Sequence, residues 1–248
     1  MSIDREWPEG VARHALLKVD STMAEAARLA PQLAGPAWVL AHEQTAARGR
    51  RGRVWRHPKG NFSATYVCRP KGDASHRALY SFVAALALDA ALAAVSGPHA
   101  RLGIKWPNDV LLNGGKVAGI LLESLGDAGL AIGIGVNLMQ APGREDVEPG
   151  AVAPVSLHSE CGLTVTPLEF LDALGPAFHH FSQQFALYGF DPIRAAWLSR
   201  AARLGEIVTA RTGTESYTGI FDTIDLRGAM ILKQPDGPRA ISAADVFF

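Results

Sequence analysis

The sequence predicts an α+β protein, in which a large body of mixed strands and helices precedes a small all-β module. Three observations carry this prediction. Apolar segments with strand-like and helix-like spacing alternate over residues 1–203. Within them, two short apolar runs flank Asn113-Gly114-Gly115, which favours a β-hairpin. Residues 204–248 change to short strands joined by Gly- and Asp-containing turns, a pattern typical of a small β-barrel.

Composition predicts a folded protein with a substantial core, because 48% of the 248 residues are hydrophobic and 19% are charged. Lys+Arg and Asp+Glu are both 24, and a dedicated nucleic-acid binder usually carries a basic excess. The first ten residues lack the apolar stretch of a signal peptide, and the longest apolar run is too short to cross a bilayer. Cys68 and Cys161 have neither metal-ligand nor disulfide spacing. We therefore expect a cytoplasmic protein without a membrane partner.

The elements follow from periodicity and from capping residues. Thr22 and Glu25 fit a capping box, and Thr166-Pro167 with Glu169 fits a second one. The expected helices cover residues 22–33, 77–95, 167–185 and 191–204. The expected strands cover residues 38–42, 61–68, 102–106, 110–112, 117–122, 130–136, 207–211, 217–221 and 229–233. Residues 140–154, which are rich in Gly and Pro, are expected to form a loop.

Positive charge is concentrated in one segment, residues 47–55, which we call the arginine loop. It contains four arginines and two glycines within residues 48–53, followed by Val54 and Trp55. Glycines let the backbone approach a ligand, and guanidinium groups match carboxylate or phosphate oxygens. The segment therefore indicates a loop that closes over a small anion, although a solvated basic loop is the alternative. Because its charges lack partners until an anion arrives, we expect the loop to be mobile without ligand.

A second cluster follows the hairpin signal. Lys105 and Asp109 frame a strand-to-turn corner that also holds Asn108, and Lys116 follows the turn of the hairpin. We expect a hairpin of this length to bring Lys105, Asp109 and Lys116 around one pocket, although a surface salt bridge beside a Pro turn is the alternative for Lys105 and Asp109. Several cations beside one carboxylate suit nucleotidyl transfer, in which the cations balance phosphate charge and the carboxylate holds Mg²⁺. Gly133 and Gly135 lie on one face of a later strand, which suggests close approach by another group there.

Together these segments resemble the signatures of biotin protein ligases. The similar segments are residues 48–55, 105–109 and 115–121, with Asp20-Ser21-Thr22 before them and residues 133–137 after them. The resemblance covers about residues 15 to 248 and implies a biotin/lipoate-ligase-type catalytic domain over residues 1–203, followed by an SH3-like β-barrel over residues 204–248. Only about 20 residues precede Ser21, too few for a winged helix–turn–helix, so we expect a short form without specific DNA binding.

The resemblance implies a two-step reaction. Biotin and ATP with Mg²⁺ give biotinyl-5′-AMP and pyrophosphate. A lysine ε-amine of a biotin carboxyl carrier domain, part of a biotin-dependent carboxylase, then attacks the adenylate and releases AMP. A homodimer is a possible assembly for a protein of this family.

The resemblance also implies roles for individual residues. The biotin site would comprise Ser21, Thr22, Met23, Gln44, Arg48, Gly49, Arg50, Lys116 and Gly119. The ATP and adenylate site would comprise Arg51, Arg53, Trp55, Lys105, Asn108, Asp109 and Asn137. Lys116, Arg48 and Arg50 would be the catalytic cations, and Asp109 would hold the metal. Two positions depart from the family pattern: Met23, where Asn is frequent, and Ala47, where Gly is frequent.

Three other functions compete with this interpretation. A lipoate– or octanoate–protein ligase shares the adenylate chemistry, but its Arg-Arg-x-Ser-Gly-Gly-Gly loop is absent here. A nucleic-acid-binding module would use the arginine loop on phosphates, yet only Trp55 is available for base stacking. A degenerate biotin binder would keep Ser21, Thr22 and Gln44 but lose Lys116, which is present.

Overall fold

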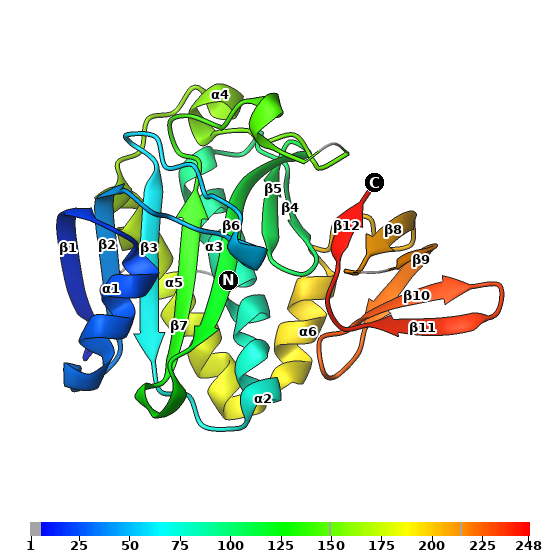
Figure 1. Cartoon of the computed structure of the whole chain (residues 1–248), viewed down its shortest axis with the longest axis horizontal. Helices are drawn as coiled ribbons and strands as arrows, with labels where there is room; N and C mark the ends of the chain where they lie inside the picture. The colour runs from blue at the N-terminus through cyan, green and yellow to red at the C-terminus, as the bar shows by residue number, and fades with distance from the viewer. Residues whose placement is uncertain (1–5, 149, 214) are drawn as a thin grey trace.

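A single mixed sheet of seven strands forms the body of the protein. The computed structural model describes residues 6–148, 150–213 and 215–248. The strand order is β1-β2-β3-β7-β6-β5-β4; β1 runs parallel to β2, and every other neighbouring pair is antiparallel (Figure 1). The strands are β1 Ala12–Val19, β2 Ala37–Gln44, β3 Phe62–Cys68, β4 Leu102–Lys105, β5 Asp109–Leu112, β6 Gly115–Ser124 and β7 Leu130–Val136.

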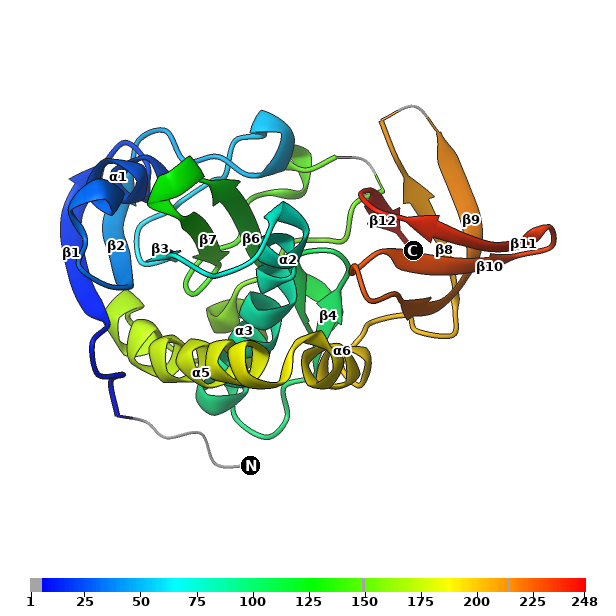
Figure 2. The ribbon, with the colours of Figure 1, turned by 90° about the horizontal axis from the view of Figure 1, so that it is seen from below.

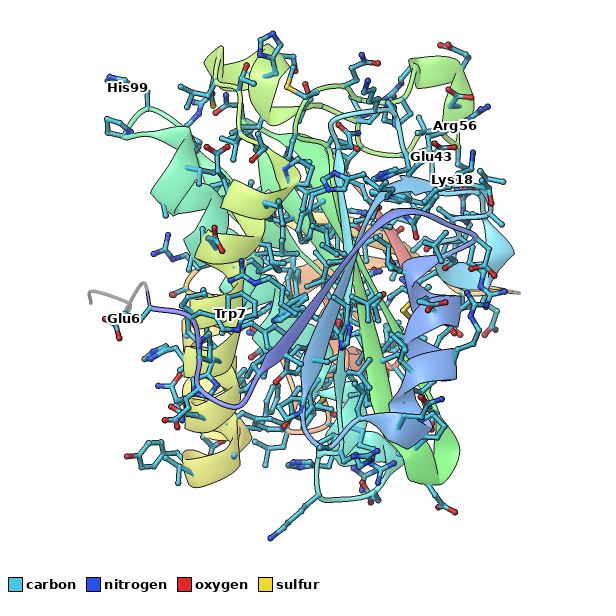
Figure 3. The ribbon with its side chains drawn as sticks, turned by 90° about the vertical axis from the view of Figure 1, so that its left-hand side faces the viewer. Glu6, Trp7, Lys18, Glu43, Arg56 and His99 are labelled. Atoms are coloured by element: carbon cyan, nitrogen blue, oxygen red, sulfur yellow. The ribbon has the colours of Figure 1, made fainter. Side chains whose placement is uncertain are left out.

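Helices cover both faces of this sheet. Helix α1 lies on one face, and α3 and α5 pack together on the other (Figures 2 and 3). The period-2 alternation of β2 explains how one strand serves both layers. Trp38 packs edge-on against Phe178 of α5, whereas the next residue, Val39, clusters with Ala26 of α1. The helices are α1 Thr22–Leu29, α2 Ala74–Ala78, α3 Tyr80–Ser96, α4 Leu157–Cys161, α5 Pro167–Tyr188 and α6 Phe190–Leu198.

Short 3₁₀ segments break several connections. They are Ala30–Gln32, Arg50–Gly52, Gly126–Ala128 and Arg144–Asp146.

The stretch Ala74–Ser96 is long and apolar enough to cross a membrane, but the same composition suits a core helix, and 67% of its most apolar window is buried. Its main part, α3, packs on α5 and against the sheet, which explains the apolar composition.

The C-terminal module is a five-stranded antiparallel sheet with the order β11-β10-β9-β8-β12. Its strands are β8 Ile207–Arg211, β9 Ser216–Ile224, β10 Met230–Gln234, β11 Gly237–Ile241 and β12 Asp245–Phe247. Trp197 of α6 is fully buried between Phe82 of α3 and Phe221 of β9. One hydrophobic cluster therefore continues from the body into the module. The predicted fold class is confirmed, and the division at residue 203 remains a prediction.

Several expected boundaries were wrong. The N-cap of α1 is Ser21, whose hydroxyl accepts from the Met23 N–H at 3.2 Å, because the Thr22 side chain bonds to Gln44 instead. The helix ends at Leu29, ahead of Pro31, and not at Leu33. The predicted elements did not include β1, an edge strand with little regular alternation, or α4, β11 and β12, which are each five residues or shorter.

The shared core predicts that the body and the module unfold together. Replacing Phe221 with Ala removes a ring that is 1% exposed and contacts Trp197. We expect a loss of about 3–5 kcal/mol in the free energy of unfolding, with one transition for both parts. Urea denaturation followed by tryptophan fluorescence and by circular dichroism would measure it. Ile220→Ala, at a neighbouring side chain that is 42% exposed, is the matched control and should cost less than about 1 kcal/mol. Two separate transitions in Phe221→Ala would contradict the shared core.

Candidate functional site

A cavity of about 470 Å³ opens on the α1 side of the sheet, between the arginine loop and β12 of the C-terminal module. Every residue that the sequence predicted for the site lines this cavity, with the exception of Arg51. The lining residues from that prediction are Ser21, Thr22, Met23, Gln44, Arg48, Gly49, Arg50, Arg53, Trp55, Lys105, Asn108, Asp109, Lys116, Gly119 and Asn137. The fold therefore brings together segments that lie more than 100 residues apart in the sequence.

One end of the cavity is a chain of hydrogen bonds between uncharged groups. Thr65 Oγ1 donates to Thr22 Oγ1 at 2.9 Å, and Thr22 Oγ1 donates to Gln44 Oε1 at 3.2 Å. The Thr22 N–H also donates to Gln44 Oε1, at 2.8 Å. These bonds fix the orientation of the Gln44 amide. Its nitrogen, a donor, has no partner within the described part of the chain, so it is available to a carbonyl oxygen.

The floor of the cavity is made of glycines that the chain's own side chains cover. An added Cβ on Gly133 would lie 2.7 Å from Met23 Sδ, and one on Gly135 would lie 2.5 Å from Trp55. A Cβ on Gly119 would also approach the Trp55 ring, at 3.2 Å. The predicted close approach at Gly133 and Gly135 is confirmed. The resulting surface is flat and apolar, which suits the ring of a ligand.

A cluster of charged groups occupies the opposite end. The Asp109 carboxylate lies 2.6 Å from Lys116 Nζ and 3.6 Å from Lys105 Nζ. Burial would raise the pKa of Asp109, but Lys116 and then Lys105 outweigh it and hold that pKa below its usual value. Burial lowers the pKa of Lys105, although Asp109 opposes this. The predicted grouping of Lys105, Asp109 and Lys116 around one pocket is confirmed.

A β-bulge explains how Lys116 reaches this cavity. The register between β5 and β6 pairs Val110 with Ala118 but Leu111 with Lys116, so Val117 is the extra residue. With regular alternation, Lys116 would share a face with Ala118, which is in the core. The bulge instead places Lys116 and Gly119 on the cavity face, and both line it. The turn before it uses Asn113 and Gly114, both at positive φ, as the Asn-Gly signal predicted.

The arginine loop is fastened to acidic residues of other segments. Asp245 of β12 lies 2.8 Å from Arg51, 2.9 Å from Arg53 and 3.9 Å from Arg50. Arg53 also lies 2.9 Å from Glu148. The expectation that these charges have no partners without a ligand was wrong. β12, which was not predicted as a strand, lies beside the loop and supplies Asp245. Arg51, which has a left-handed φ of 56°, contacts Asp245 but does not itself line the cavity.

Two asparagines position backbone around the cavity. Asn108 Oδ1 accepts from Arg50 at 3.1 Å, and its Nδ2 donates to the Ile120 carbonyl at 2.6 Å, so Asn108 joins the arginine loop to β6. Asn137 follows β7 and donates from Nδ2 to the Val155 carbonyl at 3.1 Å. Asn137 is 2% exposed and lines the cavity.

The charged end of the cavity offers one carboxylate, that of Asp109, flanked by two ammonium groups, to a divalent cation. No group of three or more His, Cys, Asp or Glu side chains suited to a metal occurs within residues 6–148, 150–213 and 215–248. A single carboxylate does not form a protein cage, but it fits Mg²⁺ in its common mode, bound to phosphate oxygens and waters with one protein carboxylate.

Four lining residues have no signal in the sequence. Ser63 lies among ordinary strand residues, and Glu148 lies in the Pro- and Gly-rich loop. Asp245 and Phe247 belong to β12, three residues long, which was not expected as a strand. Periodicity cannot identify Glu148, Asp245 and Phe247, because their place in the cavity depends on where the C-terminal module sits beside the body, and a serine in a strand carries no local signal of a site.

The Asp245 contacts predict how the arginine loop responds to proteolysis. Asp245→Asn removes the shared partner of Arg50, Arg51 and Arg53, which we expect to cost the closed loop about 1 kcal/mol. Limited trypsin digestion without added ligand, with mass spectrometry of the cut sites, should show roughly fivefold faster cleavage within residues 48–53. Asp222→Asn, which removes an ion pair with Lys233 in the same module, is the control. Equal cleavage rates in the two variants would show that the ion pairs of Asp245 do not hold the arginine loop closed.

Comparison with protein families gives two matches. Residues 15–138 match the biotin/lipoate A/B protein ligase family, and residues 204–248 match the biotin protein ligase C-terminal domain. A biotin–[acetyl-CoA-carboxylase] ligase of Paracoccus denitrificans is 60% identical over 94% of this chain and 99% of its own length. A biotin–[acetyl-CoA-carboxylase] ligase of Mycobacterium tuberculosis is 32% identical over 84% of this chain and 77% of its own. The bifunctional ligase/repressor BirA of Bacillus subtilis is 31% identical over 84% of this chain, which spans 65% of that protein.

Solved structures give the same grouping. The biotin protein ligase of Aquifex aeolicus in complex with biotin and ATP superposes with a TM-score of 0.81 at 25% identity, over 95% of this chain and 97% of that one. The biotin protein ligase of Leishmania major in complex with biotinyl-5-AMP superposes with a TM-score of 0.69 at 23% identity, over 95% of this chain and all of that one, and supports the fold alone. The sequence and structure matches agree over nearly the whole chain: it belongs to the biotin/lipoate A/B protein ligase family and carries the biotin protein ligase C-terminal domain.

Proposed function

We propose that this protein is a biotin protein ligase that makes biotinyl-5′-AMP from biotin and ATP and transfers the biotinyl group to a lysine of a carrier domain. The observation that carries the proposal is the continuity of the cavity. An uncharged, hydrogen-bonding end built on Thr22 and Gln44 opens directly into a cationic end built on Lys116 and the arginine loop. Such a cavity suits an acid whose head is polar but uncharged and whose reacting end is a carboxylate.

The uncharged end is the proposed site of the biotin ring system. The free Gln44 amide nitrogen would donate to the ureido oxygen, and Ser21 at the N-terminus of α1 would do the same with its hydroxyl proton. Met23 and the floor at Gly133 offer apolar surface to the thiophane ring and the valeryl chain. Met23 stands where a polar residue is frequent in the family, so this contact is one of packing.

The cationic end supports the first chemical step. Biotin carboxylate and the α-phosphate of ATP are both anions, and the attack of one carboxylate oxygen on phosphorus requires that their repulsion be removed. Lys116, Arg48 and Arg50 line this part of the cavity and would hold those oxygens together. Pyrophosphate leaves with the electrons of the broken P–O bond. Positioning and charge stabilisation are the main work in such a step.

The nucleotide would lie between the glycine floor and the C-terminal module. Trp55 stacks on Gly119 and Gly135 and lies 5.8 Å from Lys116 Nζ, so its ring would face the adenine. Lys105, Arg53, Asn108 and Asn137 line the same region, and Arg51 contributes from outside it through Asp245. Mg²⁺ bound to the triphosphate, with Asp109 as its carboxylate ligand, would neutralise further phosphate charge.

In the second step the carrier lysine amine attacks the biotinyl carbonyl carbon, and AMP leaves. The proposed carrier is the biotin carboxyl carrier domain of a biotin-dependent carboxylase. The protein is proposed to act in the cytoplasm, without a membrane or specific DNA partner, as a monomer or a homodimer. Specific protection of biotin-operon DNA in a footprinting experiment would contradict the proposal that the protein has no specific DNA partner.

The choice of acid tests the proposed function. We expect pyrophosphate release with Mg²⁺-ATP and biotin, together with the mass of biotinyl-adenylate, and no comparable release with lipoate or octanoate. The hydrogen bonds through Thr65 and Thr22 orient the Gln44 amide, whose nitrogen would have no partner in an apolar acid, and this is the physical reason for the preference. Release with lipoate alone would assign the chain to a lipoate ligase. Release with none of the acids would favour a binding role.

Lys116 is the proposed catalytic cation that can be tested most directly. Lys116→Ala should lower kcat for pyrophosphate release by about 10²–10³-fold, because a preorganised charge near the reacting oxygens is lost. Stopped-flow pyrophosphate release and circular dichroism would separate the loss of chemistry from a loss of folding. Lys233→Ala, at a side chain that is 62% exposed in the C-terminal sheet, is the control and should leave kcat unchanged. A loss of less than tenfold in Lys116→Ala would remove Lys116 from the catalytic set.

A further inference from the structure

Ser63 and His57 form a hydrogen-bonded pair on the cavity wall that the proposed reaction does not use. Ser63 lies on β3, two residues before Thr65, and therefore on the same face of that strand. It is 3% exposed and lines the cavity. Its Oγ lies 2.7 Å from His57 Nδ1 and makes no other hydrogen bond within residues 6–148, 150–213 and 215–248. The second ring nitrogen, Nε2, lies 3.3 Å from the His42 main-chain oxygen.

The His42 carbonyl sets the direction of both hydrogen bonds. A carbonyl oxygen only accepts, so Nε2 carries a proton and donates to it. In a neutral imidazole the other nitrogen, Nδ1, then accepts, and the Ser63 hydroxyl donates to it. Burial lowers the pKa of His57, with the His42 carbonyl and Glu43 opposing, so the ring is neutral at pH 7. The single hydroxyl proton of Ser63 is therefore used in the bond to His57, and Ser63 Oγ can act only as a hydrogen-bond acceptor towards the cavity.

We propose that Ser63, oriented by His57, is a specificity-determining residue that accepts a hydrogen bond from an N–H of the acid substrate. This inference rests on the proposed function, because biotin carries two ureido N–H donors whereas lipoate and octanoate carry none. The Gln44 nitrogen, in the same cavity, supplies a donor for the ureido oxygen. The cavity thus has an acceptor and a donor that match the two kinds of polar atom in the ureido group.

Protonation of His57 would reverse the direction of the hydrogen bond between His57 and Ser63. A charged imidazole donates from both nitrogens, so Ser63 would accept from Nδ1 and turn its own proton towards the cavity. Glu43 of β2 favours the charged ring, and its carboxylate lies 2.5 Å from Lys18 of β1. His42 disfavours the charged ring. Lys18, Glu43 and Arg56 gather at one end of the molecule (Figure 3), and Arg56 is paired with Asp146 at 2.8 Å.

The sign of the pH effect follows from these contacts. The neutral ring is the form that keeps Ser63 an acceptor, and the pKa of His57 lies below its usual value of 6.5. Biotin affinity should therefore be full at pH 7.5 and fall as the pH drops through that lowered pKa. Octanoate, which has no N–H, should not show this dependence.

Calorimetric titration of the full chain with biotin and with octanoate, in steps from pH 7.5 down to pH 4.5, tests the inference. Ser63→Ala should weaken biotin binding roughly tenfold at pH 7.5 and leave octanoate binding unchanged. His57→Asn keeps an acceptor oxygen near the position of Nδ1 but does not titrate. It should bind biotin within about threefold of the parent at pH 7.5, and its affinity should not show the additional fall that the parent shows below the pKa of His57.

Matched controls keep the test decisive. Ser199→Ala removes an exposed hydroxyl that donates to the Ala196 carbonyl in the last turn of α6, and should change neither affinity nor its pH dependence. Ser63→Cys provides a second variant with a poor acceptor if Ser63→Ala does not fold. Equal effects of Ser63→Ala on biotin and octanoate, or an unchanged pH dependence in His57→Asn, would overturn the inference. Failure of the proposed function would differ, since the parent protein itself would then release no pyrophosphate with biotin.

Discussion

The structure depends on placing several cations beside one another in a partly buried cavity. Lys105, Lys116 and Arg50 would repel one another, and burial adds a desolvation cost. Asp109 offsets this within the body, at 2.6 Å from Lys116, and Asp245 offsets it from the C-terminal module, at 3.9 Å from Arg50. Because the second carboxylate comes from a separate sheet, the charge balance of the cavity requires both parts of the protein. This requirement agrees with the hydrophobic core that they share through Trp197.

Polar groups with a fixed hydrogen-bond direction dominate the other end of the cavity. Thr65 donates to Thr22, Thr22 donates to Gln44, and the resulting orientation leaves the Gln44 nitrogen as a free donor in the described structure. Selectivity in such a site arises mainly from the cost of leaving these groups unpaired. The charged end acts on the carboxylate and phosphate groups, and the uncharged end distinguishes one acid from another.

Much of this arrangement was predictable from sequence, and the rest depended on tertiary geometry. The Asn113-Gly114 turn and the glycines at 133 and 135 have local signals, because turn conformation and close approach restrict residue type. Asp245 and Ser63 have none, since any strand can carry an Asp or a Ser. Thr22 had a local signal that predicted the wrong role. The sequence around it fits a capping box, but its hydroxyl is hydrogen-bonded to Gln44 and Thr65, and Ser21 caps the helix instead. Local rules gave the helix, and long-range contacts decided between neighbouring hydroxyls.

The bulge at Val117 has a consequence for how this hairpin can vary. Lys116 and Gly119 reach the cavity because one extra residue shifts the alternation of β6 between them. If Val117 instead paired with Leu111 in a regular ladder, Lys116 would turn to the face of Ala118 and the core, while Gly119 kept its place on the floor. Insertions elsewhere in the loops alter length without altering which face a side chain occupies. The hairpin between β5 and β6 is therefore a segment whose strand register, and not only its composition, is under chemical constraint.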